Sequence, residues 1–401
     1  MKREVLIYSW TGEENIGDEL ILKSIARMVQ KIDSRVKVNA MGTKPKVINK
    51  IHSSLGLNRV STYVNWTIKS FLRAILKHNI IKVILNILLS NQLIIASGGA
   101  LSDWNPSSTK TIFFLIDLFS FMNKPICMIG VGAGPILKEK SKIRFYNKLK
   151  KLEVITVRDE ESYKLLKSIG LNNVVLTGDS VFNITKLLQD KYPKKEVKDK
   201  SVAFVLARLF KVGTKESKEY RREIIRTIRR LKKEKWKITL IPFHYSEDIG
   251  FLKSINKKCK VEVFVSENMY DTIGELNNKN IIVGMRYHSV ILSLIFGKKV
   301  IPLIYHPKVY SVARQFGVLD LSENVGNGEN WIESNIDSER ILKNIHDLYK
   351  SSVSVIESRE RTLRIVKQKD LNTEILASFL RCSSAMENLE VDSNLYTMEA
   401  K

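Results

Sequence analysis

Six consecutive residues, Gly284-Met285-Arg286-Tyr287-His288-Ser289, form the densest group of side chains in this sequence that could do chemistry. They lie between a short apolar run at 281–283 and an apolar helical pattern that begins at His288, which predicts a turn from a strand into a helix. The first N–H groups of a helix are unpaired and favour an anion, and Arg286 and His288 would add donors on the same side. The pattern therefore predicts an anion site. The alternative is structural, with Arg286 paired to a carboxylate and His288 capping the helix.

A lysine follows the next apolar strand of the same pattern. The stretch Tyr305-His306-Pro307-Lys308-Val309 comes soon after an apolar run at 300–303. Two neighbouring strand ends would bring Arg286, His288 and Lys308 around one small volume. Several cations in one place suit a ligand that carries both a phosphate and a carboxylate. Taken alone, Lys308 would be interpreted as a surface lysine after a turn proline.

Glycine-containing turns follow the predicted strands in the first half of the chain. An apolar run at 4–8 leads into a turn with Asn15 and Gly17, and then into a helical pattern at 18–32. Three later runs, at 92–96, 126–129 and 154–157, lead in the same way into Gly98 and Gly99, into a turn at 130–135, and into Arg158 with a helix from 159. Alternating strands and helices predict a parallel sheet, whose ligands bind beyond the carboxyl ends of the strands.

A break at 191–200, where a mixed charge run follows Tyr192-Pro193, predicts the boundary between two domains. Beyond it Arg208 and His244 each follow an expected strand. The elements expected there are strands at 202–206, 237–241, 261–265, 281–283 and 299–303, and helices at 215–233, from 247, from 270 and at 288–296. We therefore expect a first domain over 1–190, a second over 200–350, a helix at 351–381 that packs back across both, and a tail at 382–401.

The two most apolar regions, 80–97 and 111–122, are interrupted by polar residues such as Lys82 and Asp117. Neither supplies the ~20 uninterrupted apolar residues of a membrane span, so they are interpreted as buried helices and a strand. The N-terminal apolar run is too short for a signal peptide, which argues against export. Three cysteines, far apart in the sequence, are typical of a reducing compartment. A cytoplasmic location is expected.

The chain is strongly basic, because 66 Lys and Arg residues face 42 Asp and Glu residues and give a formal net charge of +24. Such a charge favours an anionic partner, whether a nucleic acid, a membrane surface or a phosphorylated small molecule. The lysines are spread through amphipathic patterns, as at 215–237, and none of these stretches resembles a nucleic-acid-binding arm. We therefore expect no nucleic acid partner. A solvated, lysine-rich surface is the alternative explanation of the charge.

Taken together and in order, these segments resemble the polysaccharide pyruvyltransferase family. The stretch from Gly284 to Lys308 is similar to its Gly-Met-Arg-x-His segment, which is followed by a strand and a Tyr-x-x-Lys-Val segment. The other matching stretches are Asn15-Ile16-Gly17-Asp18-Glu19, Ser97-Gly98-Gly99-Ala100-Leu101, Gly130 to Pro135, Thr156-Val157-Arg158-Asp159, and Gly178-Asp179. Order and spacing hold from about residue 5 to 318. Glu14 and Ser97 depart from the pattern, because each stands where the family commonly has glycine.

The resemblance implies two doubly wound, Rossmann-like domains that face each other across a cleft, as in the GT-B-type glycosyltransferases. It also implies phosphoenolpyruvate as the donor substrate, with no cofactor, and a glycan or polyprenyl-linked saccharide as the acceptor. The acceptor would meet the first domain and phosphoenolpyruvate the second. An acceptor on a polyprenyl phosphate would lie on an anionic membrane face, and the net charge would then favour peripheral contact at the inner face of the membrane.

Forming a pyruvate ketal requires an acid and a base. We assign His288 as the candidate general acid, with phosphate binding as its alternative role. Asp18 is the candidate for orienting or deprotonating the acceptor hydroxyl, and its alternative is an ordinary first-turn carboxylate. The substrate-binding candidates are Arg286, Lys308, Asn15, Gly17, Arg158, Arg208, His244, Gly98 and Gly99. A local salt bridge is the alternative for Arg158.

No metal is expected, because a site at His244 would need a third ligand that the sequence does not identify. Two rival functions stay open at this point. One is a sugar-nucleotide-dependent glycosyltransferase of similar two-domain architecture. The other is a non-catalytic glycan-assembly protein, which the departure at Glu14 in the first loop would fit.

Overall fold

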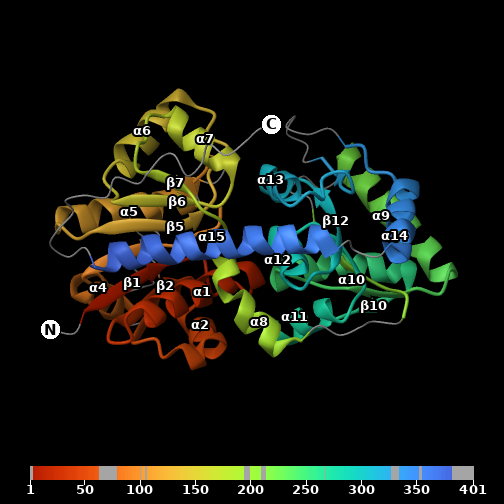
Figure 1. Ribbon diagram of the computed structural model, residues 1–401, viewed down its shortest axis with the longest axis horizontal. Helices are drawn as coiled ribbons and strands as arrows, with labels where there is room; N and C mark the ends of the chain where they lie inside the picture. Colours follow the sequence, from red (N-terminus) through yellow and green to blue (C-terminus); the bar gives the residue numbers. More distant parts are fainter. Residues whose placement is uncertain are drawn as a thin grey trace.

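The computed structural model describes residues 3–62, 79–99, 101–103, 106–193, 199–208, 214–266, 268–326, 334–351 and 355–381. Two parallel sheets lie side by side, each with helices on both faces, and one long helix runs along them (Figure 1). The tail at 382–401 falls outside the described residues. Within the described part of the chain, no helix combines the length and the apolarity that crossing a membrane requires.

The first sheet has the strand order β3-β2-β1-β4-β5-β6-β7, and every neighbouring pair is parallel. Its strands are β1 (Glu4–Tyr8), β2 (Lys37–Gly42), β3 (Arg59–Thr62), β4 (Gln92–Ile95), β5 (Ile126–Val131), β6 (Val154–Val157) and β7 (Val174–Leu176). Alternate residues of a strand face opposite sides of a sheet. In β1, Val5 and Ile7 accordingly enter one core cluster and Leu6 and Tyr8 enter the other.

The second sheet repeats this order with β10-β9-β8-β11-β12-β13, again all parallel. Its strands are β8 (Ser201–Val205), β9 (Lys237–Leu240), β10 (Glu262–Val263), β11 (Ile281–Gly284), β12 (Lys299–Ile304) and β13 (Glu323–Asn324). In both sheets the strand order reverses beside the first strand. Ligands of doubly wound domains bind at this switch point, which lies between β1 and β4 in one sheet and between β8 and β11 in the other.

Helices connect the strands and cover the sheets. Those among the strands of the first sheet are α1 (Ile16–Ile32), α2 (Pro45–Ile51), the 3₁₀ turn η1 (Ser53–Leu55), α4 (Asn79–Leu89), α5 (Pro106–Phe121), α6 (Glu139–Leu149) and α7 (Glu160–Ser168). Next come η2 (Ser180–Ile184), α8 (Thr185–Lys191), α9 (Lys215–Lys233), α10 (Tyr245–Cys259), α11 (Met269–Asn277), α12 (Tyr287–Ile295), α13 (Pro307–Gln315), α14 (Ser338–Lys350) and α15 (Val355–Arg381).

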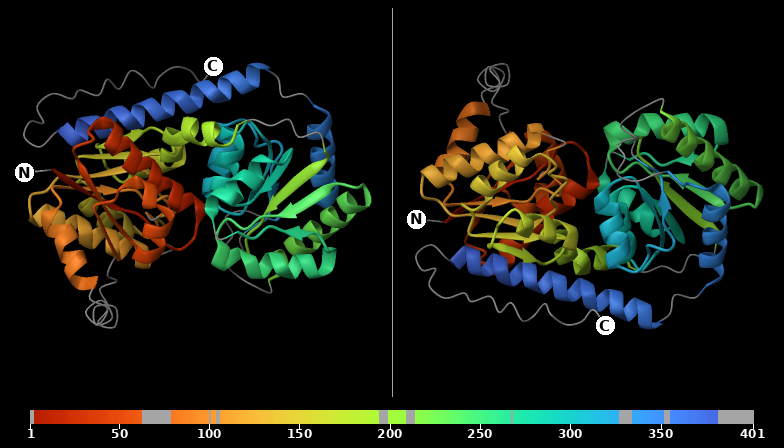
Figure 2. Two further views of the ribbon diagram at one scale, coloured as in Figure 1. Left: turned by 90° about the horizontal axis from the view of Figure 1, so that it is seen from below. Right: turned by 90° about the horizontal axis from the view of Figure 1, so that it is seen from above.

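The C-terminal helix α15 links the two halves of the molecule. It contacts α1, η2 and β5 of the first half, and Gln92 donates to the carbonyl of Phe379 at 2.9 Å. Near its other end, Arg364 donates to the carbonyl of Gln315 at the end of α13 at 2.6 Å. Both views of Figure 2 show the helix lying along both sheets.

Two sequence expectations are corrected by the structure. The strand expected at 261–265 is only Glu262–Val263. The helix in the apolar region 80–97 is not buried, because α4 exposes a whole face and Ile81 alone is 60% exposed. Strand β2 was not predicted at all. Its central Asn39 is polar but buried, and hydrogen bonds to Glu4 and Ser90 offset the cost of burying it.

Candidate active site

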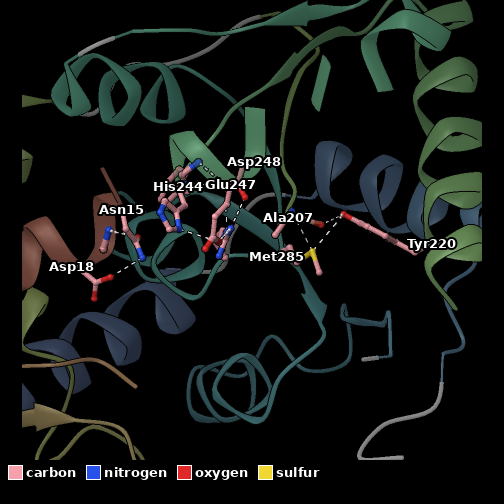
Figure 3. Close-up of polar contacts among 11 residues, drawn as sticks. Asn15, Asp18, Ala207, Tyr220, His244, Glu247, Asp248 and Met285 are labelled. Atoms are coloured by element: carbon pink, nitrogen blue, oxygen red, sulfur yellow. Dashed lines mark hydrogen bonds and ion pairs between the residues drawn. The ribbon is translucent and has the colours of Figure 1, made fainter. Parts of the chain in front are cut away.

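The two sheets meet through backbone contacts between loops at the carboxyl ends of their strands. The loop after β1 forms an isolated antiparallel bridge with the loop after β9, in which Asn15 pairs with His244. The N–H of Ile16 donates to the carbonyl of Phe243 at 2.9 Å. Figure 3 shows the resulting neighbourhood, with Asn15 and Asp18 on one side and His244, Glu247 and Asp248 beside them. Residues from both halves of the chain therefore share one site.

The first turn of α1 is organised by Asn15. Its side chain accepts from the N–H of Gly17 at 3.2 Å and donates to Asp18 Oδ2 at 2.7 Å, which makes Asn15 the N-cap of the helix. Burial raises the pKa of the Asp18 carboxyl to about 6, although the charges of His288 and Lys308 pull it down. A carboxyl with a pKa near neutrality can both take and release a proton.

The loop before α1 is anchored by a buried acid that the sequence reasoning did not single out. Glu19 accepts from the N–H of Gly12 at 2.7 Å and lies 2.8 Å from His52 Nε2. The side chains of Glu19 and His52 are buried. A buried acid with two partners fixes the loop and, through it, the position of Asn15.

His288 occupies the second position of α12 and faces the other half of the molecule. Its Nε2 lies 3.5 Å from Oδ2 of Asp179, which is buried and follows β7. Asp179 also pairs with Arg158 Nη1 at 3.3 Å, and the Arg158 guanidinium lies 3.9 Å from the ring centroid of Tyr287. Burial alone would raise the pKa of the Asp179 carboxyl, but His288 and Arg158 outweigh it and lower that pKa. Asp179 therefore stays ionised beside Arg158 and His288.

Glycines in three loops make room for these rings and guanidinium groups. A Cβ on Gly17 would meet His288 Nδ1 at 1.9 Å, and one on Gly98 would meet Arg158 Nη1 at 3.2 Å. A Cβ on Gly132, in the glycine-rich turn after β5, would meet Arg158 Nη2 at 2.9 Å. Close packing around His288 and Arg158 therefore explains these three glycines. Gly99 differs, because open space lies where its Cβ would be.

Arg286 is held by two acids at the start of α10. Its Nη2 bonds to Asp248 Oδ1 and lies 2.9 Å from Glu247 Oε2, while its Nε lies 3.3 Å from Asp248 Oδ2. The Asp248 side chain is fully buried and also accepts from the N–H groups of Phe243 and His244. Burial would lower the pKa of the Arg286 guanidinium, but Asp248 and its other partners raise it above its usual value. Arg286 is therefore a permanent cation, and its alternative pairing with a carboxylate is observed.

His244 and Glu247 form a second, more exposed pair. His244 Nδ1 lies 2.9 Å from Glu247 Oε2. The hydrogen bond from His244 is the largest cause that lowers the pKa of the Glu247 carboxyl to about 2, and Arg286 adds to it against the effect of burial. His244 precedes α10 as its N-cap residue, without a side-chain capping bond. It therefore contributes a ring at the edge of the site rather than a helix cap.

Lys308 is half-buried in the first turn of α13, and its Nζ lies 5.8 Å from the ring centroid of Tyr305. Its charge lowers the pKa of Asp18, so the cation acts on the same site. His306 caps α13 by accepting from the N–H of Lys308 at 3.3 Å. Burial, Lys308 and Arg158 lower the pKa of His306 to about 2, which keeps that ring neutral and able to accept.

Arg208 lies just beyond the end of β8 and is exposed. The capping alternative for His288 is not observed, because Arg286 is the N-cap residue of α12 and no side chain caps that helix. No group of three His, Cys, Asp or Glu side chains in the described ranges could hold a metal ion.

Sequence reasoning missed the acids that hold the cations. Asp179 was present in a recognised Gly178-Asp179 pair, and Glu247 and Asp248 stand at a predicted helix start after His244. Acids in the first turn of a helix normally satisfy the helix dipole, so their pairing with Arg286 required the three-dimensional structure. His288 and Asp179 belong to different halves of the chain, and sequence spacing does not relate them.

Solved structures with a similar fold extend over almost the whole chain. The UDP-GlcNAc 2-epimerase of Neisseria meningitidis bound to UDP-GlcNAc has a TM-score of 0.59 at 11% identity, covering 94% of this chain and 99% of its own. S. aureus MnaA with UDP has a TM-score of 0.60 at 12% identity, covering 95% and 96%. Medicago truncatula UGT71G1 complexed with UDP-glucose has a TM-score of 0.52 at 13% identity, covering 94% and 96%. These likenesses show a two-domain GT-B-type fold.

Sequence comparisons assign the family. No curated protein sequence matches this chain. A sequence profile of one family, described as polysaccharide pyruvyl transferase, matches residues 15–307. This match runs from Asn15 at the first switch point to the start of α13, so it covers all strands of the two sheets except β1 and β13 and includes Asp18, Arg286 and His288. The chain therefore belongs to the polysaccharide pyruvyl transferase family.

Proposed function

We propose that this protein transfers the pyruvyl group of phosphoenolpyruvate to two hydroxyls of one sugar in a surface or cell-wall glycan, with release of phosphate. The observation that carries this proposal is the meeting of Asp18, from one domain, with His288 and Lys308, from the other. A proton acceptor on one side and cations on the other are what addition to an anionic enol phosphate requires. The match to the family supports the same reaction.

The donor would bind on the side of the second domain. Phosphoenolpyruvate carries a carboxylate and a phosphate close together, and Arg286, Lys308 and the N-terminus of α12 place positive charge around one volume. Nε and Nη2 of Arg286 already bond to Asp248 and Glu247. These acids fix the direction of the guanidinium plane, so Arg286 would act as a preorganised cation rather than as a flexible one.

The reaction would proceed in two additions to the same carbon. His288 donates a proton to the CH₂ carbon of the enol while a sugar hydroxyl, deprotonated by Asp18, forms a C–O bond to the neighbouring carbon. The CH₂ carbon thereby becomes a methyl group. A second hydroxyl then displaces phosphate and closes the ketal, and the proton of that hydroxyl leaves with the phosphate, because Asp18 already holds the proton of the first hydroxyl. Asn15, which donates to Asp18 Oδ2 at 2.7 Å, would orient this base.

The acceptor would be a glycan or a polyprenyl-linked saccharide that meets the first domain beside Asn15, Gly17, Gly98 and Gly99. The protein would work in the cytoplasm, at the inner face of the membrane where such lipid-linked saccharides are exposed. Neither a cofactor nor a nucleic acid partner enters the proposed reaction.

Phosphate release from phosphoenolpyruvate, measured with a panel of free and lipid-linked saccharides, tests the proposal. Arg286→Ala and His288→Ala should abolish acceptor-dependent release. His346→Ala and Arg222→Ala are matched controls, because the half-buried His346 and the exposed Arg222 pair with acids elsewhere on the second domain. Thermal shift with phosphoenolpyruvate and with UDP-sugars gives a second readout. Stabilisation by UDP-sugars alone would transfer the assignment to a glycosyltransferase, and stabilisation by neither would favour a non-catalytic protein.

A further inference from the structure

Helix α4 is apolar on two opposite faces. Val83 and Ile87 are buried in the core cluster of the first sheet. The outward-facing residues are Ile81 (60% exposed), Ile84 (46%), Leu85 (38%), Leu88 (57%) and Leu89 (49%). Their spacing of three, four and seven residues aligns them in a stripe along the helix. A surface helix normally turns a polar face to water, so five large exposed apolar side chains on one helix indicate a surface that binds something.

The stripe continues onto the end of α5. Phe121, the last residue of α5, is 86% exposed. The Lys124 ammonium donates to the carbonyl of Ile87 at 3.0 Å and to that of Leu88 at 2.7 Å, so the turn after α5 lies beside the C-terminal end of α4. We call Ile81, Ile84, Leu85, Leu88, Leu89 and Phe121 the α4 patch. Figure 2 shows α4 on the face of the first domain that lies opposite α15.

The charge around the α4 patch has one sign. Lys82 is the charged residue of α4 and is exposed, and Lys124 lies at the end of the stripe. In the sequence, no acidic residue occurs between Asp33 and Asp103, whereas ten Lys and Arg residues do. Asp117 of α5 is neutralised by Lys148 and Lys151. An apolar stripe with cations around it and without opposing acids is complementary to an anionic layer above hydrocarbon.

We propose that the α4 patch docks this protein on the surface of an anionic lipid bilayer, with α4 lying in the plane of the interface. The apolar side chains of the patch would enter the boundary between headgroups and acyl chains, and Lys82 and Lys124 would contact the headgroups. A protein partner is the less suitable occupant, because a charge of +24 favours a continuous anionic surface. Docking involves neither Asp18 nor His288, so it stands apart from the proposed reaction.

Co-sedimentation of the full chain with vesicles, without donor or acceptor, tests the docking. Vesicles that contain about 30% phosphatidylglycerol are compared with phosphatidylcholine vesicles at low and high salt. The patch variant is Ile81→Ser with Leu88→Ser. Its matched control is Leu137→Ser with Ile143→Ser, which removes apolar side chains of similar exposure (67% and 62%) from another surface. Thermal melting checks that both variants fold.

The wild type should bind the anionic vesicles at least about tenfold more strongly than the neutral ones, and salt should weaken this binding. The patch variant should lose at least about tenfold in binding, while the control keeps it. Absence of vesicle binding by the wild type, or equal binding by both variants, would overturn the proposal. Conversion of a wild-type dimer into a monomer by the patch substitutions, with vesicle binding unchanged, would assign the patch to an interface between copies.

Discussion

The imidazole of His288 lies against the Cα of Gly17, so closely that a methyl group there would come within 1.9 Å of His288 Nδ1. Gly17 is the second residue of the helix that follows the first strand of one domain, and His288 is the second residue of the helix that follows the central β11 of the other. The two switch points are therefore in contact, and the contact depends on the absence of a side chain at Gly17.

Gly17→Ala should hold the two domains apart and lower acceptor-dependent phosphate release by at least about 100-fold, because a displacement of about 1 Å at a reacting group has that effect. Small-angle scattering should show a larger radius of gyration. Gly250→Ala is the control, since open space lies at its Cβ, and alanine is the better helix former at that position in α10. Wild-type activity in Gly17→Ala would contradict this account of domain contact.

Asp179 supplies the second prediction, because it holds both His288 and Arg158. Asp179→Asn keeps an oxygen for the N–H of Val181, which the aspartate accepts at 2.9 Å, but removes the charge. Loss of one member of a buried ion pair costs about 3 kcal/mol, which chemical denaturation should detect. The kcat should fall together with stability, because His288 loses a fixed partner. A fully stable and active Asp179→Asn variant would show that Asp179 positions neither His288 nor Arg158.

Much of this site could be predicted from the sequence because its loops follow local rules. Apolar runs that end in glycine turns predict strand ends, and strand ends of a parallel sheet lie along one edge. Arg286 and His288 were placed together in this way, and the resemblance to the family added Asp18. The helix start expected at 288 is observed as α12, which begins at Tyr287.

The rest depended on contacts between distant parts of the chain. The pairing of Asp179 with His288 joins two domains, and nothing in the spacing of these residues predicts it. Asn39 made β2 unrecognisable, since its burial is tolerated only through hydrogen bonds that form in the folded sheet. The exposure of α4 was missed for a related reason, because an apolar helix is normally buried.

The two acids that bind Arg286 should differ strongly in their effect on stability. Asp248 is fully buried, so Asp248→Asn should lower the free energy of unfolding by about 3 kcal/mol. The Glu247 side chain is 57% exposed, and solvent screens its charge, so Glu247→Gln should cost no more than about 1 kcal/mol. Urea denaturation of both variants at pH 7 measures the difference. Equal losses of free energy in the two variants would mean that burial does not determine how much each acid contributes to stability.

The pH dependence of stability should reveal the state of Asp18. Burial raises the pKa of this carboxyl from 3.8 to about 6, so folding favours the protonated form. The contribution of Asp18 to the free energy of unfolding is therefore fully present below about pH 4 and is lost as the pH rises through about 6. The difference between the two pKa values corresponds to about 3 kcal/mol. Asp18→Asn should match the wild type in stability at pH 4 and exceed it by about this amount at pH 7.5.

Activity should respond in the opposite direction, because a general base must be ionised to accept a proton. The kcat of the wild type should rise with pH and level off above about 6, whereas Asp18→Asn should lose this limb together with at least about 100-fold of its rate. Glu13→Gln is the control, since Glu13 lies in the same loop but pairs with Lys44 away from His288. A variant that gains stability at pH 7.5 and keeps its rate would mean that the half-buried position of Asp18 has a structural reason. A variant that gains stability and loses its rate would show a half-buried carboxyl that is kept at a cost in stability because the reaction uses it.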